Sequence, residues 1–157
     1  MRVLVPGGSG FIGSYLADEL LADHEVHAAG LREDVSSVES FYGRPVPYIH
    51  CDYSIESLEE IIERVKPDAV VNLAAKRPAT KDKDISSYYR NLYISANMFE
   101  ACFNKGVLNL VNISTRLVYS QFNSIPWRES EPPAPQNYYG LSKQWSEDAA
   151  AFYNRKG

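Results

Sequence analysis

Four of the nine glycines fall within the heptapeptide Gly7–Gly13, GGSGFIG. The spacing Gly7-x-x-Gly10-x-x-Gly13 directly follows the apolar run Met1–Pro6 and opens a helical pattern. Glycines in such a turn let a pyrophosphate approach the backbone, and the N-terminus of the next helix supplies N–H groups and a positive dipole. Because the triplet lies between an expected strand and an expected helix, it favours a dinucleotide-binding loop over an ordinary turn.

A second chemical pattern is the pair Tyr139 and Lys143, four residues apart on an expected helix. An ammonium about 4 Å from a phenolate stabilises it by roughly 4 kcal/mol at an effective dielectric near 20, or about three pKa units. The pair is therefore a candidate acid/base, with the pKa of Tyr139 expected to fall from about 10 toward 7. A solvated tyrosine and lysine is the alternative, since both lie opposite the expected apolar stripe. That stripe consists of Leu141, Trp145, Ala149 and Phe152.

Two further candidates lie where expected strands end. Ser114 and Thr115 follow a strand-like run, and a hydroxyl there can donate to a carbonyl oxygen that becomes an alkoxide. The small residues of Asn72–Ala75, NLAA, leave room for a ring or a ribose. Each has a plain structural alternative, because the hydroxyls can satisfy loop backbone and the small residues can pack a helix on a sheet.

The elements that would position these residues alternate between short apolar runs and helical periods. This alternation predicts an α/β fold with a doubly wound parallel sheet of about five strands, covered on both faces, with ligands at the carboxyl ends of its strands. A proline-rich loop over Ser120–Gln136, with Trp127, Arg128 and Glu129, is a candidate part of a substrate site. The expected strands are Met1–Pro6, Glu25–Gly30, Pro47–Cys51, Asp68–Ala75 and Val107–Ser114, and the expected helices are Phe11–Ala22, Ser54–Val65, Ile85–Asn104 and one from Asn137–Tyr139 to Arg155.

Local patterns add detail to two of these helices. Ser54, with Ser57 three residues later, has the spacing of an N-terminal cap. The helix over Ile85–Asn104 carries one apolar stripe that is expected to face the core. Its members are Ile85, Tyr89, Leu92, Ala96, Phe99 and Phe103.

The chain has 157 residues, the size of one ordinary domain, with 45% apolar and 23% charged residues. A net charge of −4 without a basic cluster argues against a nucleic-acid partner. No apolar run reaches the roughly 18 residues of a membrane span, so no membrane association is expected. Cys51 and Cys102 lie far apart, which favours reduced thiols in a cytoplasmic protein. The three histidines have no ligand spacing, and no metal site is expected.

Together, the motifs occur in the order typical of a known family. The chain resembles the extended short-chain dehydrogenase/reductases, in particular the NAD(P)-dependent epimerase/dehydratase group that acts on nucleotide sugars. The resemblance covers essentially the whole chain. The segments that carry it are Gly7–Gly13 (GGSGFIG), Asp52, Asn72–Ala75 (NLAA), Asn91, Ile113–Ser120 (ISTRLVYS) and Tyr138–Lys143 (YYGLSK).

The resemblance implies a Rossmann fold and roles for the matching residues. Tyr139 would be the catalytic acid/base, Lys143 would lower its pKa and bind the nicotinamide ribose, and Thr115 would be the catalytic hydroxyl. Asn91 would be a structural position, and the full-length form would be a homodimer. The residues that would bind the cofactor are Gly7, Gly10, Phe11, Ile12, Gly13, Asp52, Tyr53, Leu73, Ala74, Ala75 and Lys143.

Several residues depart from the family pattern. Arg116-Leu117 replaces the Asp-Glu pair of the 4,6-dehydratases, which argues against dehydration. Pro6 stands where threonine is common, and Ser120 where glycine is usual.

The departure that bears on the cofactor is at the end of the second strand. Gly30-Leu31-Arg32 lacks the acidic residue that binds the ribose of NAD, and Arg32 could pair with a 2′-phosphate. Arg32 is therefore a further cofactor-binding candidate, and NADP is favoured over NAD, although Glu33 or Asp34 could still reach the ribose.

Two functions remain open. The first is an epimerase or reductase that acts on a nucleotide sugar by hydride transfer. The second is a non-catalytic NAD(P)-binding sensor or scaffold, although such proteins commonly lack the Tyr/Lys pair. Family members continue into a substrate-binding lobe, so residues 1–157 would be the NAD(P)-binding domain alone, and this domain alone is expected to be inactive.

Overall fold

A six-stranded sheet forms the middle layer of the molecule, with strand order β3-β4-β2-β1-β5-β6. The computed structural model describes residues 1–79, 84–119 and 128–156. All neighbouring strands are parallel except β3, which runs antiparallel to β4. The doubly wound α/β fold is confirmed. The strands are β1 Arg2–Pro6, β2 Glu25–Gly30, β3 Ser37–Glu39, β4 Pro45–His50, β5 Ala69–Asn72 and β6 Leu110–Asn112.

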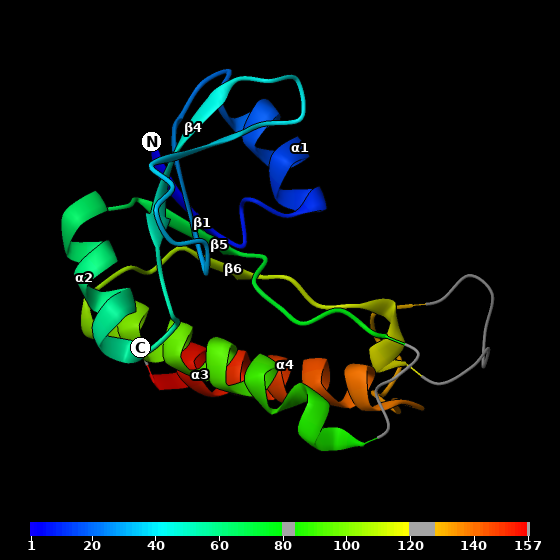
Figure 1. Cartoon of the computed structure of the whole chain (residues 1–157). Coiled ribbons are helices and arrows are strands. Elements are labelled where there is room, and N and C mark those ends of the chain that lie inside the picture. The colour runs from blue at the N-terminus through cyan, green and yellow to red at the C-terminus, as the bar shows by residue number, and fades with distance from the viewer. Residues whose placement is uncertain (80–83, 120–127, 157) are drawn as a thin grey trace.

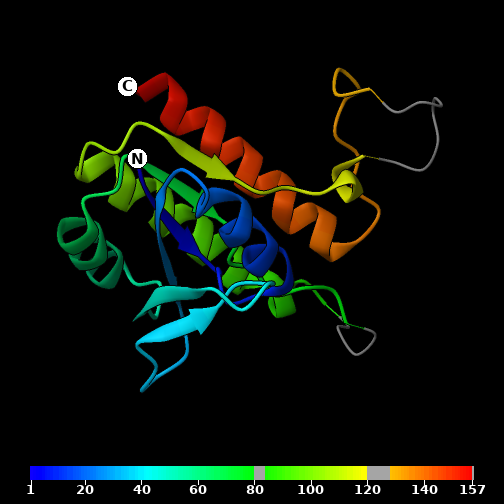
Figure 2. The same cartoon turned by 90° about the horizontal axis from the view of Figure 1, so that it is seen from above.

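Helices lie on both faces of the sheet, but unequally. Figure 1 shows α1 above the sheet and the other three α-helices below it, and Figure 2 shows α1 from its own side. Because side chains alternate along a strand, Val3 and Val5 of β1 pack toward α1, whereas Leu4 packs toward α2 and α3. The helices are α1 Phe11–Leu20, α2 Ile55–Val65, α3 Tyr89–Asn104 and α4 Tyr138–Lys156, with 3₁₀ turns η1 Ile85–Tyr88 and η2 Arg116–Val118.

Strand β3 was not predicted, and a buried carboxylate of α1 secures the hairpin that contains it. The Asp18 carboxylate accepts hydrogen bonds from Ser40 Oγ at 2.6 Å, the Tyr42 backbone N–H at 2.8 Å and Arg44 Nε at 3.0 Å. A strand of three residues has no apolar run of its own. The hairpin is held by a residue about twenty positions earlier, so sequence periodicity could not reveal it.

The predicted core faces of α3 and α4 were largely wrong. Of the predicted stripe on α3 only Phe99 is buried, and α4 buries Gly140, Ser142, Lys143 and Ser146 instead of its apolar stripe. The two helices meet through small polar side chains that hydrogen-bond each other. Ser146 Oγ donates to Ser95 Oγ at 3.0 Å, and Asn91 Nδ2 donates to Ser142 Oγ at 3.3 Å. A period of apolar residues cannot predict such a contact.

The predicted cap of α2 is present, whereas the predicted proline-rich loop is described only in part. Ser54 caps α2, since its hydroxyl accepts a hydrogen bond from the Ser57 backbone N–H at 3.2 Å. The predicted loop Ser120–Gln136 lies partly outside the described residues, and so do Ser120 and Trp127 within it. Among the described residues, no helix is long and apolar enough to cross a membrane.

Candidate dinucleotide-binding and catalytic site

The glycine loop joins β1 to α1 at the carboxyl end of the sheet, and its close packing requires glycine. A Cβ at Gly13 would lie 2.6 Å from the Cα of Gly8. Gly7 has a positive φ of 81°, and a Cβ there would lie 2.7 Å from the backbone nitrogen of Ala74. Helix α1 begins after Gly10 with no side-chain cap, which leaves its first N–H groups available to an anion. The loop therefore fits a pyrophosphate.

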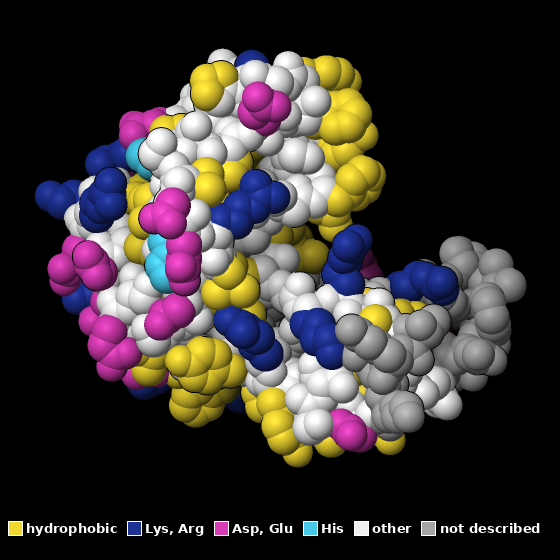
Figure 3. Space-filling model, in the orientation of Figure 1, with side chains coloured by type: hydrophobic (Ala, Val, Ile, Leu, Met, Phe, Trp, Pro, Cys, Tyr) yellow, Lys and Arg dark blue, Asp and Glu magenta, His cyan; other side chains and the backbone are white. Residues whose placement is uncertain are grey.

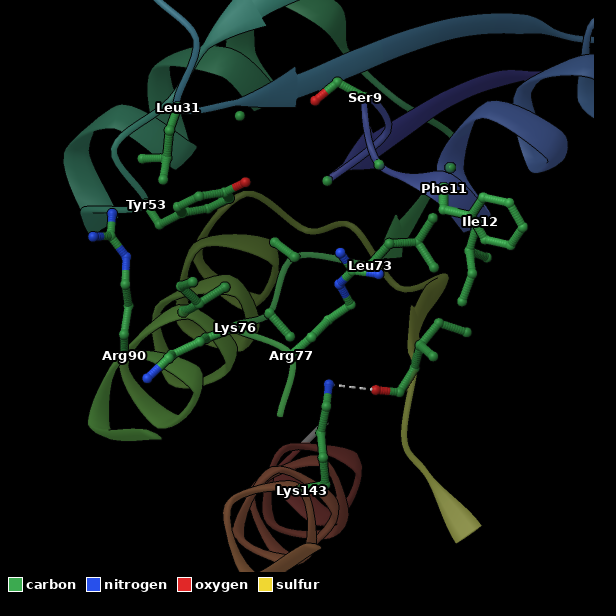
Figure 4. A pocket seen from close by; sticks show the side chains of 18 of the residues that line it. Ser9, Phe11, Ile12, Leu31, Tyr53, Leu73, Lys76, Arg77, Arg90 and Lys143 are labelled. Atoms are coloured by element: carbon green, nitrogen blue, oxygen red, sulfur yellow. Dashed lines mark hydrogen bonds between the residues drawn. The ribbon is translucent and has the colours of Figure 1, made fainter. Parts of the chain in front are cut away.

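A cavity of about 810 Å³ opens beside this loop. It brings together thirteen of the fourteen predicted site residues, from the segments that follow β1, β2, β4, β5 and β6 and from α1 and α4. Figure 4 shows Phe11, Ile12, Leu73 and Lys143 around it. The predicted residues in the lining are Gly7, Gly10, Phe11, Ile12, Gly13, Arg32, Tyr53, Leu73, Ala74, Ala75, Thr115, Tyr139 and Lys143.

Asp52 is the predicted site residue that does not line the cavity. Its carboxylate accepts hydrogen bonds from the hydroxyl of Ser54 at 2.7 Å and from the backbone N–H of the same residue at 2.8 Å. These bonds hold the pKa of Asp52 below its usual value. The residue after it, Tyr53, has a φ of 67° and a buried ring that does line the cavity.

Two buried asparagines fix the segment that follows β5. Asn72 Nδ2 donates to Asn112 Oδ1 at 2.8 Å, and Asn72 Oδ1 accepts from the Ala74 backbone N–H at 3.1 Å. Asn91 Oδ1 accepts from the Lys76 backbone N–H at 2.7 Å, and Asn91 Nδ2 donates to the Lys76 carbonyl oxygen at 3.1 Å. The predicted structural position of Asn91 thus ties the cavity wall to α3.

Lys143 lies buried at the foot of the cavity and binds the end of β6. Its Nζ donates a hydrogen bond to the Ile113 carbonyl oxygen at 2.7 Å (Figure 4). Burial lowers the pKa of Lys143, although Glu147 opposes this by raising it. Ser114, the residue after Ile113, donates its hydroxyl hydrogen bond to Glu147. The lysine therefore positions the Ser114–Thr115 segment at the edge of the cavity.

The expected fall in the pKa of Tyr139 is not present. Burial raises the pKa of Tyr139, and its ring lies 5.9 Å from that of Tyr88. The reason is that the Lys143 ammonium is directed at the Ile113 carbonyl and does not act on the phenol. Thr115 Oγ1 accepts from the Leu117 backbone N–H at 3.3 Å, so its own proton remains available to a ligand.

The cavity also contains residues that the sequence did not single out as site residues. Five cationic side chains and no acidic ones occur among the described lining residues, and Figure 3 shows Lys and Arg around the hollow. Lys76 and Arg77 could have been found from the sequence, because they form a basic pair directly after Asn72–Ala75. Tyr48 could not, because the sequence around it reads as an ordinary strand. The residues missed are Ser9, Tyr48, Lys76, Arg77, Arg90, Ile94 and Ile113.

A parallel sheet with a glycine turn at a helix N-terminus, facing a Tyr–Lys pair across one cavity, defines a Rossmann-type dinucleotide-binding protein. The sequence profile of the NAD dependent epimerase/dehydratase family matches residues 3–157. The chain therefore belongs to this family of enzymes, as its motifs indicated.

Individual relatives agree with this assignment. The UDP-glucose 4-epimerase of Azospirillum brasilense is 32% identical over 149 residues, which are 93% of this chain and 42% of that protein. The GDP-6-deoxy-D-talose 4-dehydrogenase of Aggregatibacter actinomycetemcomitans is 30% identical, over 94% of this chain and 46% of that protein. A crystal structure of UDP-glucose 4-epimerase from Brucella ovis in complex with NAD has a TM-score of 0.86 and 28% identity, over 98% of this chain and 48% of that one. The chain thus spans about half the length of these relatives.

Proposed function

We propose that residues 1–157 form the dinucleotide-binding domain of an enzyme that epimerises or reduces a nucleotide sugar by hydride transfer. The observation that carries this proposal is the single cavity that holds the glycine loop, Thr115, Tyr139 and Lys143 together. The relatives support a nucleoside-diphosphate sugar as the substrate class, since the names of two of them contain a UDP-glucose or a GDP-deoxyhexose.

The residues of the chain would divide the chemistry between them. When bound, the dinucleotide supplies a hydride acceptor. Tyr139, as its phenolate, would take the proton of a sugar hydroxyl as the hydride leaves the same carbon, so that the alcohol becomes a ketone. In an epimerase, Tyr139 would return this proton after the hydride re-enters from the opposite face. Thr115 would donate a hydrogen bond to the sugar oxygen, and Lys143 would hold the strand end that carries Thr115.

A non-catalytic sensor or scaffold with the same fold is the second candidate. It would need the glycine loop but neither Tyr139 nor Thr115. The placement of both residues on the cavity wall favours the enzyme. We further propose a homodimer and a reducing, cytoplasmic setting, the latter because Cys51 and Cys102 are both buried and unpaired.

The test compares Tyr139→Phe with Tyr138→Phe, the same change at an exposed neighbour outside the cavity lining. Reduced nicotinamide is followed by its absorbance after a panel of UDP-, GDP- and dTDP-sugars is added to protein and oxidised dinucleotide. The assay is run on this chain and on the longest polypeptide in which the chain occurs naturally. In the longer form, Tyr139→Phe should slow hydride transfer by about 10²–10⁴-fold, the usual contribution of a positioned acid/base.

The two candidate functions give different results in this assay. Tyr138→Phe should leave the rate unchanged, and neither variant should change dinucleotide affinity by more than about threefold. Dinucleotide binding with neither reduction of the dinucleotide nor conversion of any sugar to its epimer would favour the sensor. A wild-type rate in Tyr139→Phe would refute the acid/base role.

A further inference from the structure

Strand β2 ends in Gly30, which has no side chain, and the hydroxyl groups of two buried tyrosines occupy the space beside it. A Cβ at Gly30 would lie 2.6 Å from Tyr48 Oη and 3.4 Å from Tyr53 Oη. Both rings are well covered, with exposures of 5% for Tyr48 and 4% for Tyr53, and both line the cavity. In NAD-binding Rossmann sheets, an acidic residue near this position accepts a hydrogen bond from the adenosine ribose. Here phenol hydroxyls stand in its place.

Hydrogen bonding leaves both hydroxyls able to donate. Tyr48 Oη accepts a hydrogen bond from the Arg32 backbone N–H at 3.0 Å, so its own proton is available to a ligand. The Tyr53 hydroxyl has no hydrogen-bond partner within the described part of the chain, and in Figure 4 its oxygen points into the cavity. Burial raises the pKa of Tyr53, which keeps its proton in place. A buried hydroxyl without a partner costs free energy that a ligand acceptor would recover.

The charges at this end of the cavity favour an anion. Arg32 comes directly after Leu31, and Arg90 reaches from α3 toward the side where Leu31 and Tyr53 lie (Figure 4). The positive charge of Arg90 acts on the Tyr53 hydroxyl, since it opposes the rise in that pKa. Among the described lining residues there is no carboxylate that could accept from a ribose hydroxyl. Donors and cations suit a phosphate, which can only accept.

We propose that Tyr48 and Tyr53 contact the 2′ position of the adenosine ribose, and that with Arg32 and Arg90 they select a 2′-phosphate there. This inference rests on the proposed dinucleotide site and names its cofactor class as the 2′-phosphorylated one. It assigns the selectivity to two tyrosines and an arginine of α3, in addition to the arginine that follows β2.

Binding of adenine nucleotides to the intact chain tests the proposal without catalysis. Calorimetric titrations compare 2′,5′-ADP, 3′,5′-ADP and 5′-AMP, and then NADPH and NADH. Because a hydrogen bond to a charged group contributes about 1.5–3 kcal/mol, 2′,5′-ADP should bind at least about tenfold more tightly than 5′-AMP. The 3′,5′ isomer distinguishes a 2′-phosphate from any other nucleotide that carries a second phosphate.

Single substitutions test which side chains give the preference for 2′,5′-ADP over 5′-AMP. Tyr48→Phe should remove about tenfold of the preference for 2′,5′-ADP while 5′-AMP affinity changes less than about threefold. Tyr53→Phe and Arg90→Ala should act in the same direction. Tyr42→Phe is the matched control, because Tyr42 is exposed and outside the cavity lining. Circular dichroism checks that each variant is folded.

A double variant should reverse the preference. Tyr48→Phe removes the Oη that a Cβ at Gly30 would meet and leaves Cζ at an ordinary 3.6 Å. Adding Gly30→Asp then supplies the missing carboxylate, so NADH should bind more tightly than NADPH. If 5′-AMP or 3′,5′-ADP bound as tightly as 2′,5′-ADP, this inference would be overturned, but the proposed function would stand. Failure of every adenine nucleotide to bind would instead overturn the proposed function, and this inference with it.

Discussion

Gly10 is the residue at which ligand binding can be separated from folding. A Cβ at Gly7 or Gly13 would lie less than 3.0 Å from neighbouring backbone atoms, whereas at Gly10 the nearest atom is the Gly7 carbonyl oxygen at 3.1 Å, a tight contact that a small shift relieves. Gly10→Val should therefore disturb the fold less than the same change at Gly7 or Gly13, and it places its methyl groups at the start of α1, where a pyrophosphate would lie. Overpacking of about 1–3 kcal/mol corresponds to a loss of roughly 5- to 150-fold in dinucleotide affinity.

Calorimetric titration with NADPH and NADH measures this loss. Ala22→Val is the control, because it introduces the same side chain at an exposed site beyond the end of α1. Equal affinity in Gly10→Val and wild type would show that the glycine loop does not hold the dinucleotide.

Both cysteines should be unreactive in the native chain. Cys51 is fully buried, and burial raises the pKa of its thiol and raises that of Cys102 to about 12. Since the thiolate is the nucleophile, little reactive form exists near pH 8. An aromatic disulfide reagent should label the native chain far more slowly than the denatured chain, and a bound dinucleotide should slow labelling further. Rapid labelling of native protein would contradict the burial.

At the level of single residues, the spacing of the motifs identified residues that the fold brings together. Gly7, Gly13 and Lys143 lie where the motifs placed them, around one cavity. The pKa of Tyr139 was mispredicted, because a spacing of four residues brings two side chains to one face but does not direct an ammonium at a phenol. Tyr48 was missed because it reaches the cavity through the space that Gly30, on the neighbouring strand, leaves open.

At the level of elements, the Asp18 carboxylate joins α1 to the β3–β4 hairpin and so supports the strand that carries Tyr48. Burial raises the pKa of Asp18, but hydrogen bonds from Ser40, Tyr42 and Arg44 outweigh this and hold the pKa below its usual value. A carboxyl with a lowered folded-state pKa stabilises the fold above the unfolded pKa near 3.9, and this stability is lost as pH falls through the folded pKa.

Asp18→Asn should accordingly lower the melting temperature at pH 7, and the difference from wild type should shrink below about pH 4. The matched control is Asp23→Asn, the same change at an exposed position after α1. Thermal melts followed by circular dichroism across this pH range measure both. A destabilisation that stays constant with pH would show that the carboxylate charge is not what holds the hairpin.

The helix faces show where element-level prediction fails. Apolar periods located α3 and α4 correctly along the chain, yet the two helices bury serines and an asparagine against each other. The hydrogen bonds between Ser146 and Ser95 and between Asn91 and Ser142 satisfy these groups only once both helices are packed. These hydrogen bonds join residues about fifty positions apart, and the spacing of apolar residues within one helix cannot predict them.

For the whole molecule, alternation of strands and helices was sufficient to predict the sheet and its ligand edge. It was not sufficient to predict how completely the sheet is covered. Among the described residues, α1 is the only α-helix on its face, whereas three lie on the other (Figure 1). Exposed apolar side chains gather along β6 as a result, with Val111 54% exposed and Leu108, just before the strand, 83% exposed.

This uncovered region leads to a prediction about association. Strand β6 is the last strand of the sheet, and an exposed apolar edge invites pairing with a second chain. The chain should therefore self-associate, with an average mass that rises with concentration in light scattering coupled to sizing chromatography. Replacing both Leu108 and Val111 with lysine should shift the population toward monomer without lowering dinucleotide affinity, because neither residue lines the cavity.

Phe152→Lys on α4 distinguishes this surface from another exposed apolar surface. Phe152 is 53% exposed and lies on the apolar stripe of α4 that the fold leaves outside the core. If β6 is the contact, Phe152→Lys should associate as strongly as wild type. If Phe152→Lys is monomeric while the double lysine variant still associates, the helix face joins the two chains and the assignment to β6 is wrong. A wild-type chain that stays monomeric at all concentrations would exclude both surfaces.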